Sequence, residues 1–418
     1  MLESGSTPRK SDAAPFQRTA RWLLGAVILL ILYGSLFPFE FDATVKRSLY
    51  ERATSLAFKH SSRGDVFTNV LLYMPLGLCM AIALSQRWPA AARFLVTLAT
   101  GVLLSFGVEV LQTTETARVA SLTDVVFNAT GTAIGCAGAF AYLAVGTHVR
   151  VPGLADRRPA PVPLGFVLLW LSCRLAPFVP TLDWQKIKDA LKPVLLSPTV
   201  NLEECIGYLV GWLVVAHAVR RIWQREYAMP ALVLIAAGSQ VARLFTVRKT
   251  LVPSELVALL LLAVLVPVLR RWPDARRLLL LAFALAAVIA MQGLDPWRFA
   301  SPPHAFSWVP FKNSFSASLE VNVGVLLEKF FWYASLVWVL ALRGRSLVAP
   351  AAMATLVVGA IEFAQRWLPD RSAEITDPLL VLTAAGLMAL LGTSEVGAPG
   401  PAATTQAEGR GAGAGAGL

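Results

Sequence analysis

Charge is scarce in this sequence. Asp, Glu, Lys and Arg make up 15% of the 418 residues, whereas 56% of the residues are hydrophobic. One soluble core cannot bury that much apolar surface, so the composition excludes an ordinary water-soluble domain. It predicts a protein that crosses a membrane several times.

Histidine and cysteine are rare too, with four of each. The histidines are scattered and none stands in an H-x-x-x-H or H-E-x-x-H spacing, which argues against a zinc site. Each cysteine falls within an apolar segment, where a thiol packs as a small hydrophobic group, so we expect neither a disulfide nor a metal site. The sequence also has no Walker A loop, dinucleotide fingerprint or G-x-S-x-G elbow, and no cofactor is predicted.

The net charge of +11 reflects orientation in a membrane. Arginine pairs begin at positions 157, 220, 270 and 276, and all of them fall on the inner side if the N-terminus lies in the cytoplasm. Because no soluble domain carries a basic face, we expect no nucleic-acid partner. An even number of spans then places the C-terminus in the cytoplasm as well.

Long apolar runs are abundant. A hydrocarbon core about 30 Å thick requires roughly 20 apolar residues per helix, and we count about twelve such segments. They are predicted as helices because transmembrane strands would alternate in polarity. The segments are 22–39, 66–84, 89–112, 124–146, 163–180, 201–219, 228–245, 251–270, 276–293, 323–342, 346–366 and 377–393.

Polar residues between these runs recur at fixed offsets. A glutamate is followed at +3, +9 and +15 by Gln, Arg and Asp in two places, and by a degenerate version between them. The first set is Glu109, Gln112, Arg118 and Asp124; the last is Glu362, Gln365, Arg371 and Asp377; the degenerate one is Gln240, Arg243, Lys249 and Glu255. The sequence therefore predicts an all-α membrane protein with about twelve transmembrane helices, arranged as three four-helix repeats (4+4+4).

Two further sequence features accompany each set of polar residues. A Pro-aromatic pair ends an apolar helix upstream, at 38–39, 177–178 and 296–297, and polar residues stand four or five positions before a tyrosine, at 73, 208 and 333. The predicted organisation is a disordered cytoplasmic N-terminus (1–20), copy one (21–150), a degenerate middle copy (160–272), a partial third copy (275–393) and a disordered Gly/Ala-rich tail (394–418).

The tract NVLLYMPLGL, residues 69–78, begins a recognisable series of motifs. The GVEVLQ helix, Arg118, Asp124 and FNATGTAIG (127–135) follow it in order. This series resembles the VanZ-like family over roughly residues 30–145, and 295–393 in part. The resemblance implies a multi-pass protein of the bacterial plasma (inner) membrane, related by name to low-level teicoplanin resistance. The third copy departs from the pattern, since Val381 stands where copy one has Asn128.

Helical spacing gathers the polar residues of copy one. Glu109 and Gln112 share a face at the end of one helix, and Asp124 and Asn128 share a face at the start of the next. Together with Asn69 they predict a polar cluster at the outer membrane boundary. We expect it to bind a ligand through Asn69, Glu109, Gln112, Arg118, Asp124 and Asn128, and in the third copy through Glu362, Gln365, Arg371 and Asp377.

Structural interpretations of the same residues stay open. Asp124 can complete a capping box with Ser121, and Asp377 before Pro378 can cap its own helix. The two glutamates can simply pair with the arginines of their links, because an unpaired acid near hydrocarbon costs about 2–3 kcal/mol. Gly131 and Gly135, spaced as GxxxG, indicate close helix packing.

Two function hypotheses remain. In the first, the protein recognises or handles an amphiphilic envelope molecule, such as a lipoglycopeptide, a lipid-linked precursor or a phospholipid. In the second, it is a membrane-embedded enzyme that acts on a lipid-linked substrate, with Glu109 as the acid or base and Asp124 as a second catalytic candidate. Membrane lipids are expected partners of either.

Overall fold

A computed structural model describes most of the chain. The described residues are 13–37, 39–42, 48–61, 63–115, 119–145, 149–156, 159–176, 178–312, 319–344, 346–369 and 371–391. They form helices throughout; strand pairing among them is limited to isolated bridges. Of the predicted disordered ends, 1–12 and 394–418 lie outside these residues, whereas 13–20 are helical, so the predicted disorder of 13–20 is wrong.

Eight helices among the described residues are long and apolar enough to cross a membrane. They are α1 (Ala13–Leu36), α3 (Arg63–Ala83), α4 (Ala90–Gln112), α5 (Leu122–Ala144), α8 (Leu202–Ile222), α11 (Asp274–Leu294), α12 (Leu319–Ala341) and α13 (Val348–Ala364). Four apolar helices of 15 or 17 residues accompany them: α6 (Pro161–Leu175), α9 (Ala228–Leu244), α10 (Pro253–Leu269) and α14 (Thr376–Leu390). The helical membrane class is confirmed, whereas twelve spans in a 4+4+4 arrangement stay a prediction.

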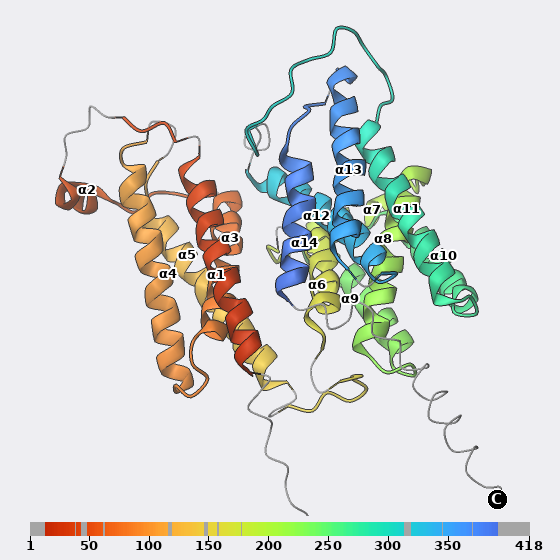
Figure 1. Cartoon of the computed structure of the whole chain (residues 1–418), viewed down its shortest axis with the longest axis horizontal. Coiled ribbons are helices and arrows are strands. Elements are labelled where there is room, and N and C mark those ends of the chain that lie inside the picture. The colour runs from red at the N-terminus through yellow and green to blue at the C-terminus, as the bar shows by residue number, and fades with distance from the viewer. Residues whose placement is uncertain are drawn as a thin grey trace, which may run out of the picture. The chain divides into compact units, whose positions relative to one another are not determined.

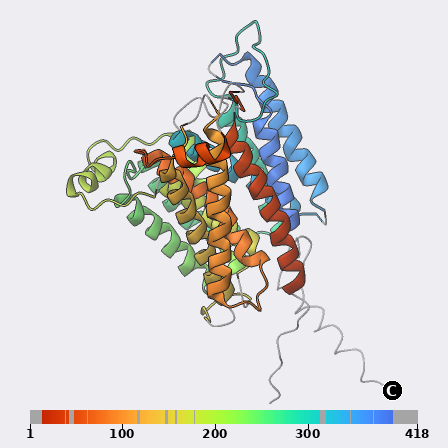
Figure 2. The ribbon, with the colours of Figure 1, turned by 90° about the vertical axis from the view of Figure 1, so that its left-hand side faces the viewer.

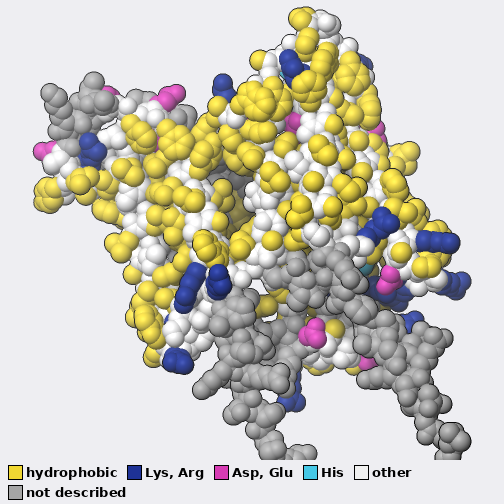
Figure 3. Space-filling model, viewed as in Figure 1, with side chains coloured by type: hydrophobic (Ala, Val, Ile, Leu, Met, Phe, Trp, Pro, Cys, Tyr) yellow, Lys and Arg dark blue, Asp and Glu magenta, His cyan; other side chains and the backbone are white. Residues whose placement is uncertain are grey.

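Large hydrophobic side chains are exposed on these helices. Hydrophobic side chains cover much of the visible face in Figure 3. Leu103 on α4, Leu260 on α10 and Leu356 on α13 are each at least 70% exposed. In water such exposure would be unfavourable, and in a bilayer it is the expected state of a spanning helix.

Two short helices were not predicted. Helix α2 (Leu49–Ser55) begins with a capping box made by Ser48 and Glu51. Helix α7 (Trp184–Leu195) begins at Asp183, whose carboxylate accepts from the Gln185 N–H. Both connect apolar helices, and they are too short and too polar to be detected as long apolar runs.

The chain divides into two compact units. Unit 1 comprises 1–199, 215–252 and 312–328, and unit 2 comprises 200–214, 253–311 and 329–418. Each is described by itself.

Helices α1, α3, α4 and α5 form a bundle in unit 1 (Figures 1 and 2). The closest packing is between α3 and α5, where a Cβ added to Gly131 or Gly135 would overlap the carbonyl oxygens of Val70 or Met74. The prediction that these glycines mark close helix packing is confirmed. Elsewhere in unit 1, α9 packs against both α6 and α7.

In unit 2, α13 packs against α14 and α11. The part of α12 that belongs to this unit is buried almost completely, including the bulky side chains of Phe331, Trp332 and Trp338. The four cysteines of the chain are free thiols, as expected.

Helices α1, α6 and α11 end in the same way. Each is followed by an aromatic residue with positive φ (Phe39 66°, Phe178 55°, Trp297 60°). The N–H of that residue donates to the carbonyl three positions earlier, at 2.7, 2.8 and 2.7 Å respectively. This turn directs the chain across the end of a second helix.

The crossing is made by one backbone hydrogen bond in each case. The backbone N–H of the third residue after the aromatic one donates to a carbonyl just beyond the last turn of another helix, which is α4, α9 or α13. The pairs are Asp42 to Thr114 (2.7 Å), Thr181 to Phe245 (2.8 Å) and Ala300 to Trp367 (2.7 Å). These acceptors lie five residues after Glu109, Gln240 and Glu362, so the geometry follows the spacing noted in the sequence.

Candidate functional site

Glu109 lies in the last turn of α4 with its side chain only 3% exposed. Its Oε2 accepts a hydrogen bond from the backbone N–H of Ser121 at 2.7 Å. Ser121 is the N-cap of α5, and its own hydroxyl accepts from the Thr123 N–H at 3.1 Å. Ser121 thus caps the helix, but Glu109, and not Asp124, binds the N–H of the capping residue. The predicted capping box of Ser121 and Asp124 is wrong.

Gln112 joins α4 to α1. Its side-chain amide donates to the carbonyl of Ser35 at 2.7 Å, next to the last residue of α1. Because this amide is buried, the hydrogen bond satisfies a group that would be costly to leave unpaired. Gln112 therefore has a structural partner inside the bundle.

Asp124 is the partly exposed member of the group. The Ser61 hydroxyl donates to its Oδ1 at 3.2 Å, and the amide of Asn69 also interacts with the carboxylate. Lys59 and Asp65 lie close enough to interact with it electrostatically. Within the part of the chain that the structure describes, its hydrogen-bond donors are neutral, and Asp124 itself is partly exposed.

Asn128 lies one turn deeper in α5 and is buried. Its Nδ2 donates to the hydroxyl of Ser105 at 2.9 Å. Tyr73 of α3, whose side chain is fully buried, interacts with both Ser105 and Glu109. The predicted residues of copy one thus share one end of the bundle, where Asn69 lies against Asp124 and Tyr73 lies between Glu109 and the Asn128–Ser105 pair. Arg118 lies outside the described residues.

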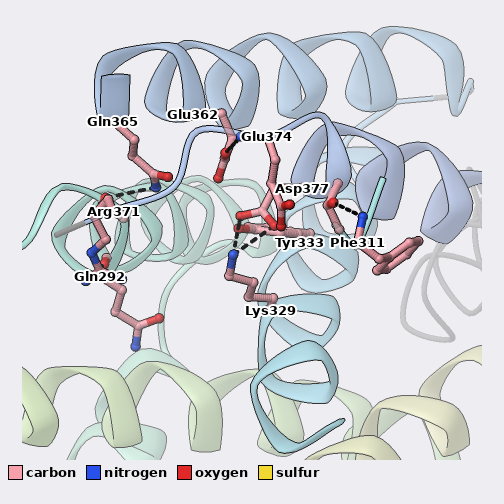
Figure 4. Close-up of polar contacts among 11 residues, drawn as sticks. Gln292, Phe311, Lys329, Tyr333, Glu362, Gln365, Arg371, Glu374 and Asp377 are labelled. Carbon is pink, nitrogen blue, oxygen red and sulfur yellow. Dashed lines mark hydrogen bonds and ion pairs between the residues drawn. The ribbon is translucent and has the colours of Figure 1, made fainter. Parts of the chain in front are cut away.

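The corresponding residues of unit 2 repeat the first two contacts (Figure 4). Oε2 of Glu362, at the end of α13, accepts from the N–H of Glu374 at 3.0 Å. Gln365 donates to the carbonyl of Gly293 at 3.0 Å, and Gly293 precedes the last residue of α11 just as Ser35 does in α1. Glu362 is 1% exposed, so this contact is fully internal.

Asp377 has different partners from Asp124. Lys329 Nζ lies 2.9 and 2.8 Å from its two oxygens, and the Tyr333 hydroxyl donates to Oδ2 at 2.5 Å. The Glu362 carboxyl also interacts with it. Asp377 is the second residue of α14 rather than its N-cap, and it is 2% exposed. The alternative in which Asp377 caps its helix is wrong; Asp377 is the buried acid of an ion pair with the partly exposed Lys329.

Arg371 binds the end of α11. Its guanidinium donates to the carbonyls of Gln292 and Asp295, at 2.9 Å each, and lies 3.6 Å from the Asp295 carboxylate. The alternative interpretation in which Glu362 pairs with Arg371 is therefore wrong, since the acid that lies beside Arg371 is Asp295. A cation that binds the last carbonyls of a helix also stabilises its dipole.

Several contact residues were missed by the sequence analysis. Lys329 and Tyr333 were noted for their spacing but had no assigned role, although a lysine within an apolar run signals a buried acidic partner. Ser61 and Ser105 carried no such signal. The carbonyls of Ser35 and Gly293 cannot be predicted from side-chain chemistry.

These observations define a polytopic helical membrane protein with polar clusters at helix ends. Residues 20–143 match the family model described as VanZ/LLP1, a span that covers most of α1, all of α2 to α4 and all but the last residue of α5. This segment of the chain is therefore similar to the VanZ-like family, which is a family of membrane proteins. Comparisons with curated proteins and with solved structures find no match.

Proposed function

We propose that this protein recognises or handles an amphiphilic envelope molecule in the bacterial plasma membrane, with both chain termini in the cytoplasm. The observation that carries the proposal is the partly exposed Asp124, whose hydrogen-bond donors among the described side chains, Ser61 and Asn69, are neutral. A lipoglycopeptide, a lipid-linked precursor and a phospholipid each combine a polar group with a lipid chain. Similarity to the VanZ-like family, with its link by name to teicoplanin resistance, supports a substrate of this kind.

The polar residues around Asp124 then have distinct roles. Glu109 and Gln112 hold α4 against its neighbours, and Asn128 pairs with Ser105. These contacts fix the helix ends that surround Asp124, so we assign them positioning roles. Arg118 and Arg371 stay predicted binding residues of their links.

The competing hypothesis of an enzyme with Glu109 as acid or base has weaker support. The Glu109 side chain is 3% exposed, and its Oε2 is engaged by a backbone N–H. A general acid or base must reach the proton that it transfers. If the protein is an enzyme, Asp124 is the better candidate.

We also propose that the protein consists of three related four-helix copies, as the repeated polar residues of the sequence predict. Three matched features support this: the aromatic turns after α1, α6 and α11, the backbone hydrogen bonds that follow them, and the shared contacts of Glu109 and Glu362. A determined structure in a bilayer tests it by superposition of 22–146 on 276–393. If the last three helices of copy one do not align with the last three helices of copy three, the proposal is rejected.

The function is tested in a deletion strain complemented with variants. Asp124→Asn keeps an acceptor for Ser61 but removes the charge, and we expect it to abolish complementation of teicoplanin susceptibility or of the lipid-linked precursor profile. Asp156→Asn changes an exposed aspartate elsewhere and serves as the matched control. Full complementation by Asp124→Asn at normal expression would remove Asp124 from the site.

A further inference from the structure

Copies one and three make the same contact through different residues. Asn69 of α3 and Lys329 of α12 stand at the same place, four positions before the tyrosine noted in each copy. The Asn69 amide forms a hydrogen bond with the Asp124 carboxylate, and the Lys329 ammonium forms one with the Asp377 carboxylate. An amide in copy one therefore takes the place of an ammonium group in copy three.

In copy three the aspartate is bound by a cation of the chain itself (Figure 4). The Nζ of Lys329 lies 2.9 and 2.8 Å from the two oxygens of Asp377, so it contacts the whole carboxylate. The hydroxyl of Tyr333 also donates to Oδ2, at 2.5 Å. Asp377 is 2% exposed, and hydrogen bonds between charged groups are stronger than those between neutral ones. Copy three thus closes its acidic site with its own ammonium group.

Copy one gives its aspartate neutral hydrogen-bond donors. Among the side chains that the structure describes, these donors are Ser61 and Asn69. Two charged groups of opposite sign, Lys59 and Asp65, also act on Asp124, through space rather than through a hydrogen bond. Asp124 and Asn69 are both partly exposed. The position that a lysine fills in copy three is thus held by a neutral, partly exposed amide in copy one.

The charge of Asp124 selects the kind of group that can bind beside it. A second anion, such as a phosphate, would be repelled by the carboxylate. An ammonium group would be attracted, and its three N–H donors match the acceptor oxygens of the carboxylate and of the Asn69 amide. A quaternary ammonium group carries the charge but has no N–H to donate. The chemistry therefore favours a primary ammonium group.

We propose that Asp124 and Asn69 bind a primary ammonium group of the ligand, at the position that Lys329 holds in copy three. The ligand is then an amphiphile whose polar part includes an amine, or a free amine. This inference rests on the proposed function of the Asp124 site and names the chemical class that the site recognises. It also gives the two copies different tasks, since copy three supplies its own ammonium group and copy one binds that of a ligand.

Isothermal titration of the purified full chain in a nonionic detergent tests the proposal. The probes are dihexanoyl phosphatidylethanolamine, dihexanoyl phosphatidylcholine and ethanolamine. We expect phosphatidylethanolamine to bind at least about tenfold more tightly than phosphatidylcholine, whose trimethylated nitrogen has no N–H donor. Ethanolamine that binds as tightly as the ethanolamine lipid would identify a free amine as the ligand; much tighter binding of the lipid would identify a head group.

Asn69→Lys gives copy one the lysine of copy three. Its ammonium group should occupy Asp124 and abolish phosphatidylethanolamine binding, whereas Ser197→Lys adds a lysine at an exposed position and should bind as wild type does. Asp124→Asn is the second test if Asn69→Lys does not fold. It should weaken binding by at least about tenfold, because a charge-assisted hydrogen bond is lost. Its matched control is again Asp156→Asn.

Equal binding of phosphatidylethanolamine by wild type, Asn69→Lys and Asp124→Asn would overturn the inference. Equal binding of the two lipids, or no binding of either amine probe, would also overturn it. If it is overturned while Asp124→Asn still abolishes complementation, the proposed function stands with a ligand of another class. If Asp124→Asn loses the lipid but complements fully, the ammonium site stands and the proposed function is rejected.

Discussion

The carboxylate of Glu109 accepts a hydrogen bond from the N–H of Ser121, twelve residues further along the chain. Glu362 does the same with Glu374, again twelve residues away. In both units an acid at the end of one helix thus fixes the start of the next. The glutamates that seemed from the sequence to be the chemical centre are bound into the fold.

Two replacements of Glu109 separate its role as a hydrogen-bond acceptor from the role of its charge. Glu109→Leu leaves the buried Ser121 N–H without its acceptor, and we expect a loss of about 1–3 kcal/mol in stability. Glu109→Gln keeps an oxygen at the same place and should lose less. Thermal unfolding of the purified protein measures both; equal stability of the two variants would show that the hydrogen bond is unimportant.

Gly135 should not tolerate a side chain. A Cβ there would overlap the Met74 carbonyl, so Gly135→Ala should force α3 and α5 apart and destabilise the protein by about 1–3 kcal/mol. Gly138→Ala, three residues later in the same helix and facing open space, is the control. It should be neutral or slightly stabilising, because alanine favours helix over glycine. Similar unfolding temperatures for both variants would contradict the close packing.

The Lys329–Asp377 pair should behave as a coupled unit. Lys329→Met leaves the buried Asp377 carboxylate without its cation, and we expect a loss of about 2 kcal/mol, moderated by the 36% exposure of the lysine side chain. The double variant Lys329→Met with Asp377→Asn removes both charges and should regain part of this loss. A double-mutant cycle with additive effects would show that the two residues are not coupled.

Cysteine labelling tests the membrane orientation. Single cysteines at Val119 and Ser372, both exposed in the links that follow α4 and α13, should react with an impermeant maleimide in intact cells. A cysteine at the exposed Gln224 should react only after the cells are opened. The reverse pattern would place the N-terminus outside.

Sequence reasoning located the helices well because long apolar runs have a single solution in a bilayer. The predicted segment 89–112 corresponds to α4 (Ala90–Gln112), and 124–146 to α5 (Leu122–Ala144). It missed α7 because an amphipathic helix lacks such a run. Only its protein-facing side, around Ala190, is buried, and Trp184 and Leu195 remain exposed.

The candidate site was predicted in location but not in its pairings. Helical spacing correctly brought Glu109 near the start of the next helix. It could not show that a backbone N–H would be the partner, because every residue but proline offers the same donor. For the same reason the sequence offered Arg371 only a ligand or an acid as partner, although its guanidinium also binds the carbonyls of Gln292 and Asp295.

The aromatic turns after α1, α6 and α11 have a consequence for the surrounding lipid. Each helix stops at a bulky residue with positive φ, and the next few residues are bound to the end of a neighbouring helix. Such a helix cannot add or lose a turn to suit a thicker or thinner membrane. Changes in bilayer thickness would therefore be met by helix tilt or by local deformation of the lipid rather than by a change in helix length at these ends.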